Sequence, residues 1–171
     1  MTDGPTVDDL LTRLRDAGAG LLALRGPLVA GEPWPLSPDY GTGPEASWGP
    51  REVLAHVDEM LPYWTGQLRS VLAGDPNGAT PFGRIATDQS RLDRIDAARQ
   101  RPADELLDEI DAGLVTATAF VAERSAADLA RRGLHPTRGE LTVGESLDRF
   151  IVSHLAEHVA QLESTLAAHP D

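Results

Sequence analysis

FIVSHLAEHVAQL, residues 150–162, places two histidines inside an apolar run that has the period of an α-helix. At about 100° per residue, His154 and His158 lie roughly 40° apart and one turn from each other. Ile151 and Leu162 fall near the same direction, so both imidazoles sit in the stripe that faces the protein core. Because an unpaired buried imidazole is costly, a shared metal ion is the simplest partner for both. The alternative is a pair of core histidines that hydrogen-bond to the backbone or to carboxylates.

The helix that carries this pair has a recognisable beginning. The sequence Thr142-Val143-Gly144-Glu145 has the Thr-x-x-Glu pattern of a capping box, and the apolar period continues to about Ala168. A helix of roughly 26 residues spans about 40 Å at 1.5 Å per residue. This segment is therefore long enough to form one rod of a helical bundle.

Three further amphipathic helices are predicted from the same period, over Val7–Arg25, Pro50–Leu72 and Pro102–Arg124. Thr6 suits the N-cap of the first helix, and Gly26-Pro27 is expected to stop it. Gly49 suits the N-cap of the second helix, in which Pro62 is expected to kink the axis or shift the local hydrogen bonds.

The connections differ in length. Residues 27–47 are expected to form an ordered loop, and residues 125–141 a short helical turn followed by a loop. Residues 75–101 form a long connection, with a short helix over Asp88–Arg99. Four long helices with a long link between the second and the third indicate an all-α four-helix bundle with a crossover connection. The length of 171 residues suits a single domain over residues 1–171.

Composition excludes several function classes. The formal charge of −12 argues against a nucleic-acid-binding surface, and all 15 basic residues are arginine. No apolar run is long enough to span a bilayer, and the acidic residues 1–5 lack the basic region of a secretory signal. We therefore expect a cytoplasmic protein without membrane contact. The absence of cysteine excludes disulfides, thiolate zinc sites and a cysteine nucleophile.

His56 adds a third candidate nitrogen from a different helix. It lies on the flank of the apolar stripe of the second helix, about 100° from its centre, so an exposed surface histidine is the alternative. His135 and His169 are expected to be exposed to solvent, with His135 a candidate pocket residue.

Other candidate site residues lie on the same two helices or just before the second one. His154-Leu155-Ala156-Glu157-His158 matches the H-x-x-E-H signature of inverted zinc peptidases, but those enzymes are far larger and need an acidic ligand far downstream. Glu157 is instead a candidate to orient a metal ligand or to shuttle a proton. Trp48, Tyr63 and Trp64 are candidates for a pocket wall, with ordinary core positions as the alternative.

Two segments resemble a known family. SWGPREVLAH, residues 47–56, resembles the start of the second helix in the DinB-like (DinB/YfiT) four-helix superfamily. LTVGESL, residues 141–147, followed by His154-x-x-x-His158, resembles its fourth helix. The resemblance implies an up-down-down-up bundle, a divalent metal held by His56, His154 and His158, and a homodimer.

The resemblance also implies an activity. Characterised relatives include transferases and isomerases that use mycothiol or bacillithiol, and the metal-binding domain of ergothioneine-forming sulfoxide synthases. The maleylpyruvate isomerases among them carry Glu where this chain has His154. Since the chain has no cysteine, a sulfur nucleophile would have to be a low-molecular-weight thiol cosubstrate.

The sequence thus predicts a metal-dependent enzyme that activates a low-molecular-weight thiol or water for S-transfer to, or hydrolysis of, a small electrophile. Three neutral nitrogens leave an open coordination position, as in catalytic metal sites. Imidazole suits zinc, nickel and ferrous iron alike, and zinc is the ion that we expect. The alternatives are a non-catalytic helical dimer with a structural or sensing metal, and a plain bundle with hydrogen-bonded core histidines.

Overall fold

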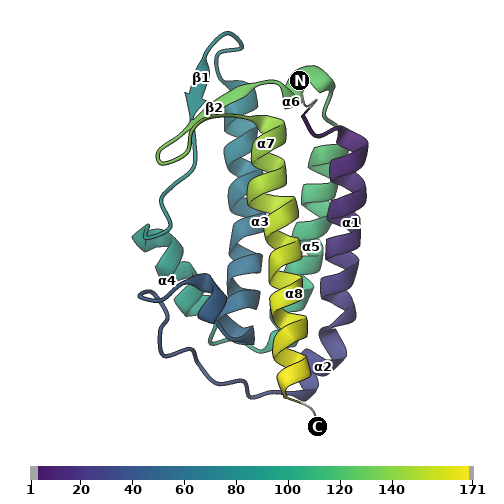
Figure 1. Ribbon diagram of the computed structural model, residues 1–171, viewed down its shortest axis with the longest axis vertical. Coiled ribbons are helices and arrows are strands. Elements are labelled where there is room, and N and C mark those ends of the chain that lie inside the picture. Colours follow the sequence, from purple (N-terminus) through teal and green to yellow (C-terminus); the bar gives the residue numbers. More distant parts are fainter. Residues whose placement is uncertain (1–3, 170–171) are drawn as a thin grey trace.

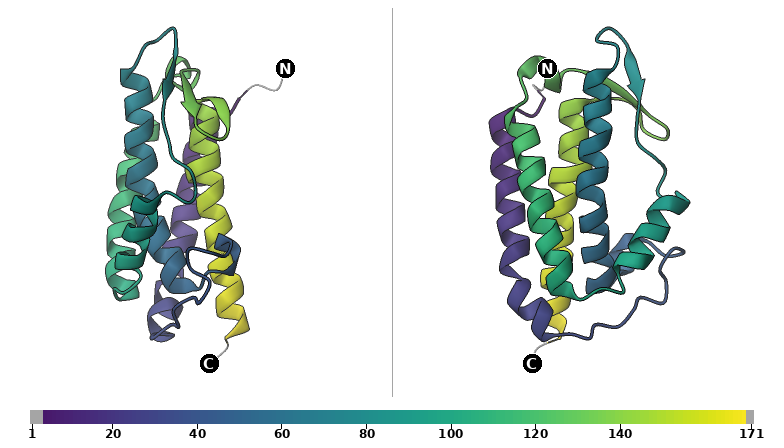
Figure 2. Two further views of the ribbon diagram at one scale, coloured as in Figure 1. Left: turned by 90° about the vertical axis from the view of Figure 1, so that its left-hand side faces the viewer. Right: turned by 180° about the vertical axis from the view of Figure 1, so that it is seen from behind.

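The computed structural model describes residues 4–169, and four long helical rods run side by side along its long axis (Figure 1). They are α1 (Val7–Ala23), α3 (Pro50–Ala73), α5 (Ala103–Ala122) and a last rod built from α7 (Val143–Leu147), η2 (Asp148–Val152) and α8 (Ser153–Ala168). The first and last rods run in one direction, and α3 and α5 run in the other (Figures 1 and 2). Residues 74–102 carry the chain back along the bundle between α3 and α5. The predicted up-down-down-up bundle with a long crossover is confirmed.

The helix caps follow the predicted pattern. The hydroxyl of Thr6 accepts a hydrogen bond from the backbone N–H of Asp9, at 3.2 Å. Thr142 and Glu145 form both bonds of a capping box. The inward faces of the rods supply an apolar core that includes Leu10, Leu14, Leu61, Leu107, Phe120 and Leu162.

The first helix ends differently from the prediction. A turn at Leu24 separates α1 from a short helix α2 (Arg25–Ala30), so Gly26-Pro27 does not stop the helical path. Pro27 lies in the first turn of α2, where its missing N–H has no intrahelical partner to lose. Leu28 in α2 is fully buried and extends the core toward that end of the bundle.

A three-stranded sheet replaces much of the loop that the sequence predicted after the third helix. The chain first forms the predicted helical turn, α6 (Ala126–Leu129). Two strands follow α6, namely β2 (Arg132–His135) and β3 (Gly139–Thr142), and they pair antiparallel. Strand β1 (Ala79–Pro81), which comes from the crossover before α5, pairs in parallel with β2. Gly133 is required here, because a Cβ at that position would lie 2.5 Å from the ring of Phe82. Gly139, with φ +74°, closes the turn between β2 and β3.

The two remaining connections pack against the side of the bundle (Figure 2). The crossover contains α4 (Gln89–Ala98), which matches the short helix predicted over Asp88–Arg99 and has Asp88 as its N-cap. The loop after α2 contains a short 3₁₀ helix, η1 (Glu45–Ser47). The buried carboxylate of Glu52 on α3 accepts hydrogen bonds from the backbone N–H of Ser37 and from the guanidinium of Arg99, each at 2.9 Å. This one side chain therefore ties both connections to α3.

The sequence predicted one continuous α-helix for the last rod, but the structure departs from this. Residues 148–152 form the π-helical turn η2. The carboxylate of Asp148 accepts hydrogen bonds from Arg13 of α1 at 2.7 Å and from the hydroxyl of Ser153 at 2.6 Å. The wider turn changes the phase of α8 relative to α7, and π-turns of this kind are frequent at functional sites.

Three further expectations concern the membrane, the N-terminal segment and Pro62. None of the helices within residues 4–169 is both long enough and apolar enough to cross a membrane. Of the acidic N-terminal segment, residues 1–3 lie outside the described residues. Pro62 lies inside α3, which continues through it as one helix.

Candidate metal centre

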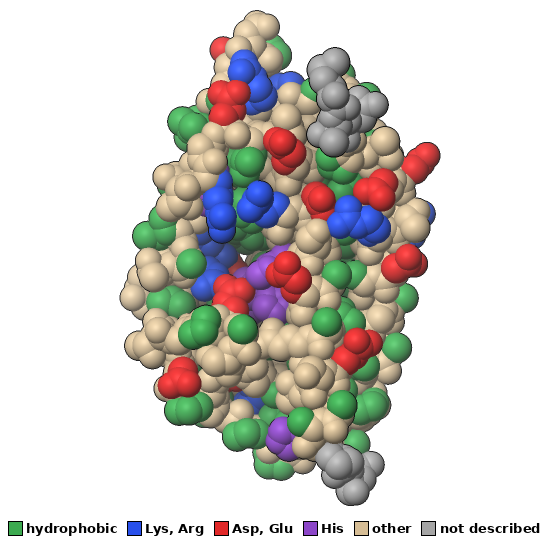
Figure 3. All heavy atoms as spheres, in the orientation of Figure 1, with side chains coloured by type: hydrophobic (Ala, Val, Ile, Leu, Met, Phe, Trp, Pro, Cys, Tyr) green, Lys and Arg blue, Asp and Glu red, His purple; other side chains and the backbone are tan. Residues whose placement is uncertain are grey.

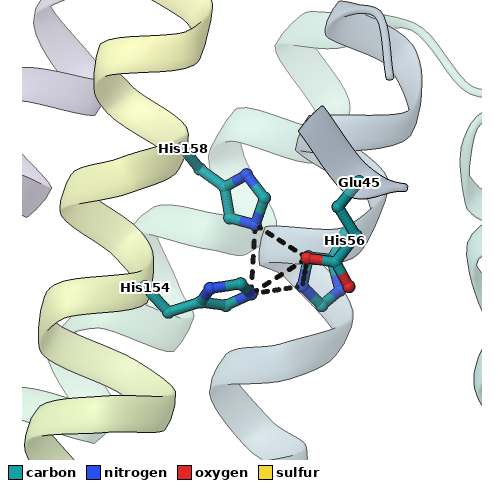
Figure 4. Close-up of side chains that lie close together, drawn as sticks. All are labelled: Glu45, His56, His154 and His158. Atoms are coloured by element: carbon teal, nitrogen blue, oxygen red, sulfur yellow. Dashed lines mark hydrogen bonds and ion pairs between the residues drawn. The ribbon is translucent and has the colours of Figure 1, made fainter. Parts of the chain in front are cut away.

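Four side chains from three elements meet at one point between α3 and α8 (Figure 4). His56 comes from α3, His154 and His158 from α8, and Glu45 from η1. The three histidines are those that the sequence selected, and Glu45 joins them. One ligand atom from each residue lies within 4.8 Å of the ligand atoms of the other three.

The distances between these atoms match those around a single small cation. Nε2 of His154 lies 3.0 Å from Nε2 of His56 and 3.2 Å from Nε2 of His158. Oε2 of Glu45 lies 3.3 Å from Nε2 of His154 and 3.7 Å from Nε2 of His56 and of His158. Ligands 2.0–2.1 Å from a tetrahedral zinc ion are about 3.3 Å from each other. The donor set and its spacing therefore fit a tetrahedral divalent cation.

The hydrogen bonds of His158 decide which of its nitrogens carries the proton. The amide nitrogen of Gln161 donates to the backbone carbonyls of Glu45 and Trp48, at 2.9 and 3.1 Å. The amide oxygen of Gln161 therefore faces Nδ1 of His158 at 3.0 Å and accepts its N–H. Nε2 of His158 is left with a lone pair that points at the cluster, as a metal ligand requires.

The other two histidines have an oxygen at the same offset along the helix. Nδ1 of His154 lies 3.4 Å from Oε2 of Glu157, and Nδ1 of His56 lies 3.9 Å from Oε2 of Glu59. With its proton on Nδ1, Nε2 of His154 also presents a lone pair, 3.2 Å from that of His158. Two lone pairs at this distance repel each other, and a cation between them satisfies both.

Burial and charge keep two of the imidazoles neutral. Burial lowers the pKa of His56 well below its usual value, and burial followed by the charge of His154 lowers the pKa of His158 to about 4. For His154, burial acts in the same direction, but the hydrogen bond and charge of Glu45 outweigh it and raise the pKa. Burial would raise the pKa of Glu45, yet the histidines and Arg91 together lower it. Glu45 is therefore an anion beside the neutral imidazoles of His56 and His158, which suits a cation.

The cluster lies at the floor of a pocket of about 430 Å³. Figure 3 shows the hollow, with histidine side chains visible inside it and basic side chains along one side. The wall includes Trp64, His135 and Phe150, whose rings stack on one another, and the mouth includes Glu157, whose side chain is 74% exposed. A small molecule can therefore reach the cluster from solvent.

The remaining candidate residues take different positions. Trp64 lines the pocket, whereas Trp48 packs edge-on against His56 and Tyr63 packs under the guanidinium of Arg84. The prediction that His135 is exposed to solvent is wrong, because it is only 5% exposed. Strand β2 turns its side chain inward against Trp64, which the sequence could not show without the sheet. His169 is exposed, as predicted.

Sequence reasoning missed Glu45 and Gln161. Glu45 lies in a loop without periodicity, and only its place three residues before Trp48 sets it apart. Gln161 had a usable signal: each of the three histidines is followed three residues later by Glu or Gln, at positions 59, 157 and 161. On a helix this spacing puts an oxygen acceptor beside the imidazole.

Comparisons with known proteins agree with this architecture. The sequence model of a family described as the DinB superfamily matches residues 5–162, while no protein of curated function matches the chain. Among solved structures, YfiT from Bacillus subtilis is similar, with a TM-score of 0.66 and 15% sequence identity over 98% of this chain and 91% of that chain. It is described as "a probable metal-dependent hydrolase with an unusual four-helix bundle topology". At this identity the likeness shows the fold.

Proposed function

Because the chain belongs to the DinB superfamily, as its two distinctive segments predicted, we propose that it is a divalent-metal-dependent enzyme acting on a small electrophile. Its nucleophile is water, for hydrolysis, or a low-molecular-weight thiol of the mycothiol or bacillithiol type, for S-transfer. The observation that carries the proposal is the meeting of three Nε2 atoms and one carboxylate oxygen at the floor of an open pocket.

In this proposal His56, His154 and His158 hold the ion, and zinc is the expected metal. The bound ion supplies Lewis-acid activation, which lowers the pKa of a coordinated water or thiol. Gln161 fixes His158 in the tautomer that can coordinate. Arg91, which pairs with Oε1 of Glu45, leaves Oε2 of Glu45 turned toward the histidines.

The residues at the pocket mouth supply the acid–base step. Glu157 lines the pocket and is the carboxylate that we assign to take the proton from the nucleophile. Trp64 and Phe150 form an apolar wall that limits water beside the reacting group. We further propose a cytoplasmic homodimer that acts on a small molecule. The formal charge of −12 supports the absence of a nucleic-acid partner.

One observation favours a second candidate function. Glu45 completes a four-donor set, and closed four-ligand sets are typical of structural zinc sites. In that case the chain is a non-catalytic metal-binding helical dimer, in which the ion fixes η1 and α8 to α3.

The experiment measures metal content and turnover on the same samples. The purified protein is loaded with zinc, its metal content is measured by mass spectrometry, and it is assayed with p-nitrophenyl esters and with bacillithiol or mycothiol plus monochlorobimane. His154→Ala and His158→Ala are compared with His169→Ala, which removes an exposed histidine outside the cluster.

We expect the wild type and His169→Ala to bind one ion per chain and to turn over substrate. We expect His154→Ala and His158→Ala to lose both the bound ion and the turnover. Zinc binding with blank assays, together with a large fall in melting temperature on chelation, would favour the structural candidate. Equal melting with and without chelator and no bound metal would overturn both.

A further inference from the structure

The metal pocket is unusually basic for so acidic a chain. Four of the 15 arginines line it, namely Arg84, Arg91, Arg138 and Arg149, although the formal charge of the whole chain is −12. Two of them are neutralised locally, because Arg84 pairs with Glu59 and Arg91 pairs with Glu45. The other two, Arg138 and Arg149, have no ion-pair partner among the described residues.

Arg138 and Arg149 reach the same side of the pocket from different elements. Arg138 lies in the turn between β2 and β3, and Arg149 lies in the π-helical turn η2. Within residues 4–169, neither guanidinium forms an ion pair or a hydrogen bond with the protein. Both side chains are exposed. Burial lowers the pKa of His135, and the positive charges of Arg138 and Arg149 lower it further. His135 is thus neutral, and the two positive charges on this side of the pocket have no ion-pair partner within the described residues.

Three stacked rings line the same pocket as these arginines and the cluster. The rings of Trp64 and Phe150 stack at 4.2 Å with an interplanar angle of 7°, and the imidazole of His135 lies 5.1 Å from Phe150 at 20°. Phe150 follows Arg149 directly and precedes His154 by about one helical turn, or roughly 6 Å. Along this rod the order is therefore basic residue, aromatic ring and cluster.

We propose that Arg138 and Arg149 form a subsite for an anionic oxygen group of the substrate, a carboxylate or a phosphate. The apolar body of the substrate, about the size of one aromatic ring, packs against the pocket wall that Trp64, Phe150 and His135 form, and its reacting group faces the histidine cluster. Two guanidiniums present planar sets of N–H donors that match such groups, and a pocket wall of low polarity strengthens their field. The statement that the substrate reacts at the histidine cluster rests on the proposed function. The binding of its anionic group by Arg138 and Arg149 does not.

The test measures ligand binding rather than turnover. Binding of 4-fluorobenzoate and of 4-fluorophenylphosphonate is followed by ¹⁹F NMR, with 4-fluorobenzyl alcohol as the uncharged counterpart. The variant Arg138→Gln/Arg149→Gln is compared with Arg15→Gln/Arg94→Gln. The control pair removes the same charge at exposed arginines that do not line this pocket. Each titration is run on zinc-loaded protein and on EDTA-treated protein, because an acid can also bind a metal.

We expect at least one acid to bind about tenfold or more tightly than the alcohol, and to lose about tenfold in the pocket variant but less than about twofold in the control. This dependence on the two arginines should persist after EDTA treatment, so a failure of the metal proposal would leave it intact. Failure of both acids to bind, binding of the alcohol as tightly as the acids, or equal losses in the two variants would overturn the subsite.

Discussion

The amide oxygen of Gln161 accepts a hydrogen bond from Nδ1 of His158 at 3.0 Å, while its amide nitrogen holds the backbone carbonyls of Glu45 and Trp48. One side chain therefore sets the tautomer of a cluster histidine and the position of the loop that carries Glu45. Gln161 thus joins η1 to α8 beside the cluster. Gln161 is a positioning residue, and its removal should be felt at the cluster.

Replacing Gln161 with Leu should lower zinc affinity by about 10–100-fold, because His158 loses the acceptor that fixes its ring and tautomer. A competition titration with a zinc chelator measures the loss. Gln161→Glu keeps an acceptor oxygen but loses donors to the two carbonyls, so an intermediate value is expected. Unchanged zinc affinity in Gln161→Leu would contradict the positioning role.

Glu45→Gln should weaken zinc binding by about tenfold without abolishing it, since three imidazoles remain and one charge is lost. The same competition titration measures this change, with the exposed Glu163→Gln on α8 as the control. A complete loss of zinc would mean that Glu45 is indispensable to the site. That outcome would support the structural candidate over the catalytic one.

Asp148→Asn should make the contribution of the π-turn to stability independent of pH. Burial raises the pKa of Asp148, but hydrogen bonds from Ser153 and Arg13 outweigh burial and lower it below the usual value. The ionised carboxylate therefore stabilises the fold above about pH 4, and this stabilisation is lost as the pH falls through the lowered pKa.

We expect Asp148→Asn to lower the free energy of unfolding by about 1 kcal/mol near neutral pH, and by less at about pH 3. Urea unfolding at the two pH values measures the difference. Asp16→Asn, an exposed aspartate on α1 without an ion pair in the described chain, should show no such pH-dependent loss. A loss that is the same at both pH values would contradict the electrostatic explanation.

Leu107→Ala should destabilise the bundle by about 2–5 kcal/mol, because Leu107 of α5 is fully buried and truncation leaves a cavity. Val115→Ala on the same helix, at a side chain that is 66% exposed, should change stability by less than about 0.5 kcal/mol. Thermal or urea unfolding measures both. A small effect at Leu107 would mean that the core relaxes around the missing side chain.

The sequence predicted the four rods well, because a long helix with one buried stripe repeats its apolar residues with a fixed period. The stripe around Ile151 and Leu162 also placed His154 and His158 together, since both belong to one helix. The sheet was missed because β1 and β2, 50 residues apart, are short and show their pairing only once α3 and the last rod hold them together.

By itself the sequence determined the all-α bundle, the caps at Thr6 and Thr142, and the pair of neighbouring imidazoles on one helix, all of which depend on residues within a few turns of each other. Only the tertiary structure decided that His56 turns from the flank of its helix into the cluster, that Glu45 completes it, and that Arg138 and Arg149 face the same pocket. These relationships join segments about 100 residues apart for the ligands and separate elements for the arginines. They depend on the phase of packed helices and on the path of loops, which local periodicity does not encode.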